Sequence, residues 1–308
     1  MTTGTWAGSD TGTGLSAGTR AALDAAGLDP SYVASVVRLA LDEDLALGPD
    51  VTTEATVPAE AVARGSVVAR AGGVVAGLPV AAAVLDLVGR GRIDVTTAVE
   101  DGTRVTCGQP VLVAYGPVRA LLTAERTMLN LLGRLSGVAT LTRAWVEAVA
   151  GTGAAIRDTR KTTPGLRALE KYAVRCGGGV NHRMALGDAA LIKDNHVTAA
   201  GGVAAAFRAV RSARPEIAVE VECDTLDQVR EVVEAGATLV LLDNMPLAEM
   251  RRAVQLVRAS GRPVRLEASG GLSLDRARAV AETGVDYLAV GALTHSAPVL
   301  DLGFDLDS

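Results

Sequence analysis

The sequence predicts an α/β protein whose second half forms a closed or nearly closed α/β barrel of fewer than eight strands. After residue 150, six short apolar runs alternate with helical patterns, as expected for parallel βα units. The helices between the runs have clear first and last residues: Thr225 precedes one that ends at Gly236, and Pro246 begins one that ends at Gly261. The six predicted strands cover residues 154–156, 189–192, 217–221, 238–242, 264–266 and 287–290.

The N-terminal part lacks this βα rhythm. Residues 1–21 are rich in Gly, Thr and Ser without periodicity, and they predict a disordered tail. A helix is expected from about residue 30 to residue 41, and another over residues 79–88, where Pro79 suits a first turn. A long helix over residues 118–150, with a leucine-rich buried stripe, then leads into the barrel.

Three segments of the N-terminal part, residues 65–70, 93–96 and 111–115, alternate like strands between glycine-containing turns. The stretch DGTRVTCGQPVLV at residues 101–113 looks like the hairpin of a biotinyl or lipoyl carrier domain. A carrier domain needs an acceptor lysine, and no lysine precedes Lys161. We therefore interpret this stretch as structural.

Composition limits the class of protein. The net charge of −5 argues against affinity of the whole chain for nucleic acid or an anionic membrane surface. The three cysteines are far apart and odd in number, which fits neither a disulfide framework nor a zinc site. The chain shows no apolar stretch that approaches a transmembrane span and no signal-peptide pattern. These features predict a soluble, cytoplasmic protein.

The segment from residue 157 to residue 196 holds all three lysines of the chain and two of its three histidines, His182 and His196. Because arginine serves almost everywhere else, lysine here suggests that a compact, flexible ammonium group is required. We therefore expect the anion-handling centre of an enzyme in this segment. Three of its cations, Arg167, Lys171 and Arg175, are spaced four apart on one predicted helix and by default form a solvated or interface face.

Charged or glycine-rich groups occur at or just after the end of each predicted barrel strand. One charged residue at a strand end usually only adds solubility, but six such ends indicate a shared site, because all C-terminal strand ends of a parallel barrel face the same mouth. The groups lie at residues 157–161, 193–196, 220–222, 243–244, 267–271 and 291. The cationic candidates are Arg160, Lys161, His182, Arg183 and Lys193, with Arg126 on the preceding helix as an addition.

The acidic candidates are Glu220, Glu222 and Asp243. Glu220 and Glu222 are two residues apart on a strand and therefore share a face. Such a carboxylate patch suits Mg²⁺, bound directly or through water, with substrate phosphates as further ligands. For Glu220, pairing with a barrel lysine or arginine as core filling is an equal alternative. The glycine loops after the last two strands suit phosphate, although a single glycine would indicate only a tight turn.

Seven motifs resemble the quinolinate phosphoribosyltransferase family, also called nicotinate-nucleotide pyrophosphorylases (carboxylating). The longest is DTRKTTPGLRALEKYAVRCGGGVNHRMALGDAALIKDNH, which begins at Asp158. The others, in chain order around it, are LDEDLALGPDVTTEA, AERTMLNLLGRLSGVATLT, VEVECDT, LLDNM, LEASGG and AVGALTHS. They cover nearly the whole chain after the tail.

The resemblance implies an N-terminal α/β sandwich domain over residues 22–128, followed by an incomplete α/β barrel of about six or seven strands over residues 129–288. The C-terminal residues 289–308 would pack back on the sandwich. It further implies a pentosyltransferase that joins quinolinate to 5-phosphoribosyl 1-pyrophosphate with Mg²⁺. The products would be nicotinate mononucleotide, CO₂ and pyrophosphate, a step of de novo NAD biosynthesis.

The resemblance also assigns roles to residues. Arg160, His182 and Arg183 would bind the quinolinate carboxylates, and in a homodimer the partner's Arg126 would reach the same pocket. Catalytic roles in binding and neutralising the pyrophosphate would fall to Lys161 and Lys193. Glu222 and Asp243 would position the Mg²⁺ complex, through water and substrate phosphates, and the ribose hydroxyls. Further substrate contacts are implied for Thr159, Ser269, Gly270, Gly271, Val290, Gly291 and Ala292.

Other functions stay open on the sequence alone. A related barrel phosphoribosyltransferase could use nicotinate without decarboxylation. A Schiff-base lyase would use Lys193 as its nucleophile. A non-catalytic binding barrel would not depend on Lys161. The sequence also leaves open whether dimers assemble into a larger oligomer.

Overall fold

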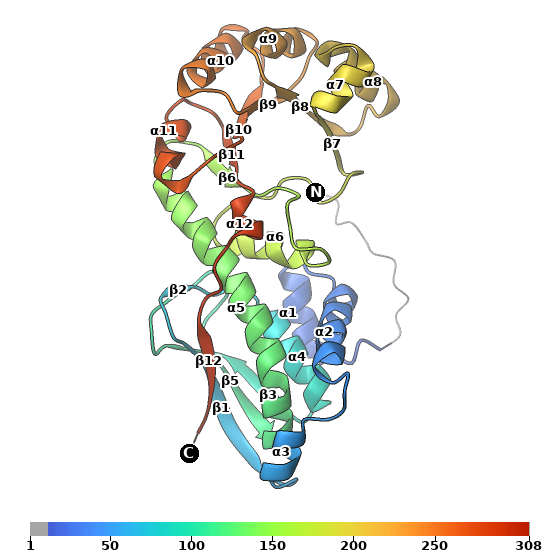
Figure 1. The fold of residues 1–308 in the computed structure, drawn as a ribbon, viewed down its shortest axis with the longest axis vertical. Coiled ribbons are helices and arrows are strands. Elements are labelled where there is room, and N and C mark those ends of the chain that lie inside the picture. Colours follow the sequence, from blue (N-terminus) through green and yellow to red (C-terminus); the bar gives the residue numbers. More distant parts are fainter. Residues whose placement is uncertain (1–11, 308) are drawn as a thin grey trace. The chain divides into compact units, whose positions relative to one another are not determined.

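The computed structural model describes residues 12–307, which form two compact units (Figure 1). The first unit combines the described residues up to Leu141 with the segment Thr163–Gly177 and the residues from Ala297 onward. The second unit combines Thr142–Thr162 with Gly178–Ser296. Each unit is therefore built from separate pieces of the chain.

The first unit contains a four-stranded antiparallel sheet in the order β12-β1-β5-β3. Its buried side chains alternate along β1, as expected when only one face of a sheet packs on the core. The strands are β1 (Val62–Ala69), β3 (Asp94–Thr97), β5 (Pro110–Pro117) and β12 (Leu302–Leu306), with a small ribbon of β2 (Gly73–Val74) and β4 (Arg104–Val105). The C-terminal strand thus pairs with β1 (Figure 1).

Helix α2 of the first unit begins at the residue that the sequence indicates. The Asp29 carboxylate accepts the N–H of Ser31 and caps α2, which has Pro30 in its first turn. The helices are α1 (Ala17–Ala25), α2 (Pro30–Asp44), α3 (Val51–Thr56), α4 (Leu78–Gly89), α5 (Val118–Ala148) and α6 (Arg167–Cys176). The long helix α5 continues into the second unit, because the boundary between the units falls after Leu141.

Two expectations for this unit are wrong. The end of the predicted disordered tail is helical, because Ser16 accepts the N–H of Thr19 as the cap of α1 and Leu23 is buried; residues 1–11 lie outside the described part of the chain. Lys171 is fully buried rather than solvated, because α6 buries six consecutive residues from Leu169 to Val174. Four-residue spacing therefore did not mark an exposed face in this helix.

The second unit is an incomplete α/β barrel. Its parallel sheet has the order β6-β11-β10-β9-β8-β7, and helices follow the strands (Figure 1). All six predicted strands are confirmed: β6 (Ala155–Arg157), β7 (Ala189–Ile192), β8 (Ala218–Cys223), β9 (Leu239–Asp243), β10 (Arg265–Ser269) and β11 (Tyr287–Ala289). The helices are α7 (Asp194–Ala200), α8 (Val203–Ala213), α9 (Leu226–Glu234), α10 (Leu247–Ala259), the 3₁₀ turn η1 (Leu274–Arg276), α11 (Ala277–Ala281) and α12 (Ala292–His295).

The barrel sheet stays open between its two end strands, β6 and β7. The segment that leads into β7 lies along β6 instead, where Val180 forms an isolated parallel bridge with Arg157. Residues 181–183 therefore enter the barrel from this open side. Within residues 12–307, no helix combines the length and apolar character needed to cross a membrane.

Candidate active site

The second unit brings almost all the predicted site residues to the C-terminal ends of its strands. Glu222 lies on β8, Asp243 is the last residue of β9, and Ser269 is the last residue of β10. The remaining site residues of this unit follow β6, β7, β10 and β11 or lie just after Val180: Thr159, Arg160, Lys161, His182, Arg183, Lys193, Gly270, Gly271, Val290, Gly291 and Ala292. Arg126 lies on α5 in the first unit, exposed, and 3.6 Å separates its Nη2 from Oε1 of Glu125.

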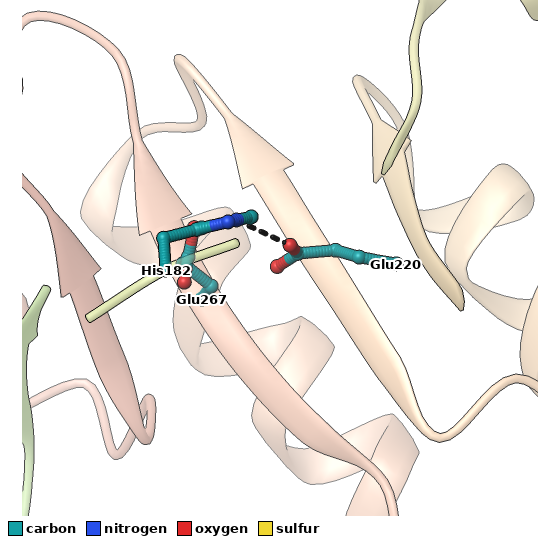
Figure 2. Close-up of side chains that lie close together, drawn as sticks. All are labelled: His182, Glu220 and Glu267. Atoms are coloured by element: carbon teal, nitrogen blue, oxygen red, sulfur yellow. Dashed lines mark hydrogen bonds and ion pairs between the residues drawn. The ribbon is translucent and has the colours of Figure 1, made fainter. Parts of the chain in front are cut away.

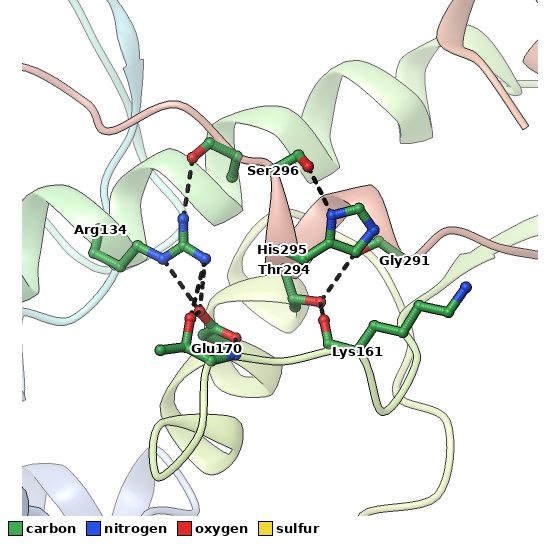
Figure 3. Close-up of polar contacts among 9 residues, drawn as sticks. Arg134, Lys161, Glu170, Gly291, Thr294, His295 and Ser296 are labelled. Atoms are coloured by element: carbon green, nitrogen blue, oxygen red, sulfur yellow. Dashed lines mark hydrogen bonds and ion pairs between the residues drawn. The ribbon is translucent and has the colours of Figure 1, made fainter.

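Buried hydrogen bonds hold the backbone after β6. The fully buried Asp158 carboxylate accepts the backbone N–H of His182 at 2.8 Å and the side-chain amide of Asn181 at 2.5 Å. Three residues after Asp158, the Lys161 carbonyl accepts the Thr294 hydroxyl at 2.8 Å (Figure 3). The Lys161 side chain extends away from this contact and is exposed. The structure thus pairs a fixed backbone with an accessible ammonium group.

Two guanidinium groups lie close to each other at the open side of the sheet. The pKa of Arg183 falls below its usual value because the group is partly buried and because Arg160 is a like charge nearby. Arg183 Nη1 donates to the Ala189 carbonyl at 2.9 Å, but the buried Nε atoms of both arginines have no hydrogen-bond acceptor among the described residues. A dicarboxylate bound here would accept these bonds and relieve the repulsion.

A carboxylate pair and one ammonium group occupy the ends of the neighbouring strands. The pKa of Glu222 rises above its usual value, first because it is partly buried and then because of repulsion from Asp243, while Lys193 opposes the rise. His196 does not join this group as a ligand: its Nδ1 accepts the backbone N–H of Lys193 at 3.0 Å at the start of α7. The arrangement suits a hard cation, which prefers oxygen ligands and would reduce the repulsion.

The loops after β9 and β10 pack tightly against each other. Gly270 has φ +88°, and a Cβ there would lie 2.2 Å from Oδ1 of Asn244. Asn244 itself has φ +51° and donates its backbone N–H to the Ser269 carbonyl. A cavity of about 320 Å³ lies beside these loops, with Arg276 in its lining. Glycine at position 270 therefore lets the two loops approach each other closely, and the same geometry would give a phosphate access to backbone N–H groups.

One further residue beside the candidate site, His295, was not singled out in the sequence. A Cβ on Gly291 would meet Lys161 Cδ at 3.0 Å and His295 Nε2 at 3.2 Å, so this glycine lies against both side chains (Figure 3). The His295 ring is exposed, and its Nδ1 lies 2.6 Å from the Ser296 hydroxyl. The signal was available, because His295 lies one helical turn after Gly291 in the motif AVGALTHS.

Comparison with known proteins identifies the family of the chain. The family model described as quinolinate phosphoribosyl transferase, C-terminal domain, matches residues 138–305, and the model for the N-terminal domain matches residues 50–136. The chain belongs to the quinolinate phosphoribosyltransferase family. The motifs in the sequence therefore identified the family correctly.

Relatives of the family span most of the chain. The nicotinate-nucleotide pyrophosphorylase [carboxylating] of Mycobacterium leprae is 58% identical over 88% of this chain and 95% of its own. A probable enzyme of the same name from Synechocystis is 42% identical over 76% and 79% of the two chains. The solved nicotinate-nucleotide pyrophosphorylase from Francisella tularensis has a TM-score of 0.85 at 37% identity and covers 90% of this chain and 96% of that one.

Proposed function

We propose that the protein transfers the phosphoribosyl group of 5-phosphoribosyl 1-pyrophosphate to quinolinate, with loss of CO₂, and so forms nicotinate mononucleotide and pyrophosphate for NAD biosynthesis. One observation carries this proposal: an arginine pair and a carboxylate–lysine group lie at the same end of one sheet. The pair is Arg160 and Arg183, and the group is Glu222, Asp243 and Lys193. A dicarboxylate and a polyphosphate together match that charge pattern. The family membership points to the same reaction.

The arginine pair would hold quinolinate. Arg160 and Arg183 present unused buried donors, and His182 lies directly before Arg183 in the same segment. Two carboxylates on adjacent carbons of one ring suit two guanidinium groups, because each can form a charge-assisted, bidentate contact. Binding in this way would fix the pyridine nitrogen relative to the ribose.

The group of Glu222, Asp243 and Lys193 would hold the pyrophosphate of 5-phosphoribosyl 1-pyrophosphate, which is the leaving group of the reaction. Glu222 and Asp243 fit Mg²⁺, directly or through water, because both are oxygen ligands. Partial burial and then repulsion from Asp243 raise the pKa of Glu222, and a cation would offset that repulsion. Bound there, Mg²⁺ would supply positive charge for the pyrophosphate. Lys161 and Lys193 would neutralise the same group, and the two carboxylates would stabilise the positive charge that develops on the ribose.

The glycine loops would hold the 5-phosphate. Ser269, Gly270 and Gly271 follow β10, and Val290, Gly291 and Ala292 follow β11, where backbone N–H groups are accessible. The reaction needs no covalent enzyme intermediate. Consistent with this, burial raises the pKa of the Cys176 thiol to about 11 and that of Cys223 to about 12, so neither is a thiolate at neutral pH.

Decarboxylation follows from the substrate's own chemistry. Attack by the pyridine nitrogen on the ribose carbon breaks the bond to pyrophosphate and leaves the ring cationic. The bond to the 2-carboxylate can then break, because the cationic ring accepts its electron pair, and the ring carbon afterwards takes a proton. The contribution of the chain is to orient the two substrates and to stabilise charge.

The test is an assay of CO₂ release from quinolinate with phosphoribosyl pyrophosphate and Mg²⁺. We expect CO₂ release that depends on both substrates and is abolished when a chelator removes Mg²⁺. Activity with Mn²⁺ in place of Mg²⁺ can be compared in the same assay. Turnover of nicotinate without CO₂ release would replace this proposal with the non-decarboxylating reaction. Borohydride trapping with a carbonyl substrate should give no adduct on Lys193, and an adduct would favour the Schiff-base lyase.

We also infer a cytoplasmic homodimer in which the partner's Arg126 completes each quinolinate pocket. The exposure of Arg126 supports the dimer. The three cysteines form no disulfide within residues 12–307, which supports the cytoplasmic location. Mixing the Arg126→Ala variant with the Lys161→Ala variant should restore part of the activity, because mixed dimers would contain one intact site. No restoration on mixing would contradict a shared site.

A further inference from the structure

Three charged side chains from alternate strands meet inside the incomplete barrel. Arg157 comes from β6, Glu267 from β10 and Glu220 from β8, and these strands are not neighbours in the sheet. Alternate strands supply the interior layers of α/β barrels, which are usually filled by Val, Ile and Leu. Here the corresponding space contains an arginine and two carboxylates, which apolar packing does not explain.

The contacts form a continuous chain that ends at His182. Arg157 Nη1 lies 2.7 Å from Glu267 Oε2, and Glu267 Oε1 lies 3.7 Å from His182 Nε2. Glu220 Oε2 lies 2.7 Å from the same His182 Nε2 (Figure 2). Glu267 is 0% exposed and Glu220 is 3% exposed, so little water competes for these bonds.

The second ring nitrogen of His182 is also engaged. Its Nδ1 lies 2.6 Å from the backbone N of Arg183, which donates its hydrogen. A neutral imidazole that accepts at Nδ1 carries its proton on Nε2, where Glu220 is the acceptor. The Arg183 N–H and the Glu220 carboxylate together fix the tautomer, and Glu220 holds the orientation of the ring at Nε2, in the way that an outer carboxylate orients a histidine in a metal site.

This cluster is not expected to add to the stability of the fold. Two buried carboxylates lie near one imidazole and one guanidinium, and both Glu220 Oε1 and Glu267 Oε1 have no hydrogen-bond donor among the described residues. Buried charge clusters are often less stabilising than apolar residues of the same volume. The cluster is also adjacent to the segment that contributes Arg183, one of the two candidate quinolinate arginines.

We propose that Glu220, Glu267 and Arg157 are positioning residues for the aromatic-dicarboxylate half of the site. The Arg157–Glu267 pair holds the interior of the barrel beside His182, Glu220 locks the His182 ring, and the ring holds the backbone at Arg183. The guanidinium groups of Arg183 and Arg160 are thereby directed at the substrate carboxylates. This inference rests on the proposed function and adds three residues to it that touch neither substrate.

The test separates the two substrates. Glu220→Leu removes the acceptor while keeping the volume similar, and Glu220→Gln retains an acceptor oxygen. We expect Glu220→Leu to weaken quinolinate binding, measured by calorimetry, by about tenfold or more, with the KM for phosphoribosyl pyrophosphate changed less than about twofold. Glu220→Gln should recover most of this loss. Glu249→Gln, in a surface ion pair on α10, is the matched control and should change neither constant.

A spectroscopic readout tests the mechanism of positioning directly. The chain has three histidines, so ¹⁵N-histidine NMR can assign the tautomer of each ring. His182 should show a protonated Nε2 in the wild type and in Glu267→Gln. In Glu220→Leu we expect a mixture of tautomers, because a ring no longer held at Nε2 can turn away from the Arg183 N–H. Thermal melts check that each variant is folded.

The outcomes distinguish this inference from the proposed function. Wild-type protein that neither binds nor converts quinolinate would overturn both. Wild-type activity combined with equal losses for both substrates in Glu220→Leu, no recovery in Glu220→Gln, or an unchanged His182 tautomer would overturn the positioning role alone. The proposed function would then stand without it.

Discussion

Each unit contains a buried glutamate paired with an arginine, and the two glutamates differ in how completely they are hydrogen-bonded. In the first unit, Glu170 Oε1 accepts from Arg134 at 2.7 Å and from the Thr163 hydroxyl at 2.7 Å, while its Oε2 accepts the Thr163 N–H at 3.0 Å (Figure 3). In the second unit, Glu267 has one arginine partner, and its Oε1 has no donor among the described residues.

The comparison separates a structural carboxylate from one that we propose to be functional. Glu170 ties together three pieces of the first unit, because Arg134 lies on α5, Thr163 precedes α6, and Arg134 also donates to the Ala297 carbonyl at 3.1 Å. Burial raises the pKa of Glu267 to about 7, and repulsion from Glu220 adds to this rise. A buried carboxylate with all its hydrogen bonds made indicates a structural role, whereas one without them beside the candidate site fits the proposed positioning role.

Breaking the Glu170 cluster should have the largest effect on stability. Glu170→Ala leaves the Arg134 guanidinium, which is 22% exposed, without its carboxylate and leaves the Thr163 donors unsatisfied. We expect a loss of about 3–5 kcal/mol in the free energy of unfolding, measured by denaturant titration. A loss below about 1 kcal/mol would contradict the assignment of Glu170 as a structural centre.

Removing a site cation should affect catalysis without affecting stability. We expect Lys161→Ala to lower kcat/KM by a hundredfold or more, which corresponds to about 2.7 kcal/mol of transition-state stabilisation. Because the Lys161 side chain is exposed, the melting temperature should stay within about 2 °C of the wild type. Full activity in this variant would favour a non-catalytic barrel.

The glycine after β10 should tolerate no side chain. We expect Gly270→Ala to cost about 1–3 kcal/mol of stability and to raise the KM for phosphoribosyl pyrophosphate, because φ is +88° and the new Cβ would meet Asn244. Gly236→Ala is the control: its φ is +99°, but nothing lies within 4 Å of the added Cβ. If both variants kept the wild-type KM, close packing at Gly270 would have no part in phosphate binding.

The Glu267 cluster should make stability depend on pH. The folded protein keeps the Glu267 proton up to about pH 7, whereas the unfolded chain releases it near the ordinary glutamate value of about 4.3. The stabilising contribution of Glu267 is therefore complete below about pH 4 and is lost as the pH rises towards 7. Melting temperatures of Glu267→Gln should fall less between pH 5 and pH 7 than those of the wild type. Parallel profiles for the two proteins would refute this.

The smallest effect is expected at the surface. Arg252 and Glu249 form a pair one helical turn apart on α10, with 65% and 35% of their side chains exposed. Arg252→Ala should change the free energy of unfolding by less than about 0.5 kcal/mol, because solvent screens such pairs. A larger change would contradict the difference expected between an exposed and a buried pair. The effect at Glu170 could then come from its ion-pair geometry rather than from its burial.

Local patterns in the sequence predicted the barrel and the position of most candidate site residues at the ends of its strands. Strand β7 was predicted at its observed bounds, and Thr225 caps α9 as expected. Burial patterns and caps depend on residues a few positions apart, so the sequence shows them directly. The convergence of Lys193, Glu222 and Asp243 followed from one rule, that parallel strands end at the same face.

Contacts between residues far apart in the chain could not be predicted from these local patterns. Lys171 was expected on a solvated or interface face, yet it is buried, because burial depends on what packs around the whole helix. Arg157 and Glu267 were seen only as charged strand ends, and their pairing across 110 residues depends on the curvature of the sheet. The alternative for Glu220, a lysine or arginine partner, was wrong in its detail, since His182 is the partner.

The sequence by itself determined the family, the order of the strands along the chain and the chemical groups at their ends, because motifs and hydrophobic periodicity are properties of neighbouring residues. Only the tertiary structure decided which of these groups touch. The open side of the barrel admits residues 181–183, and alternate strands bring Glu220 and Glu267 to His182. Which residues become partners depends on how long loops close and on where water is excluded. Neither can be read from a short stretch of sequence.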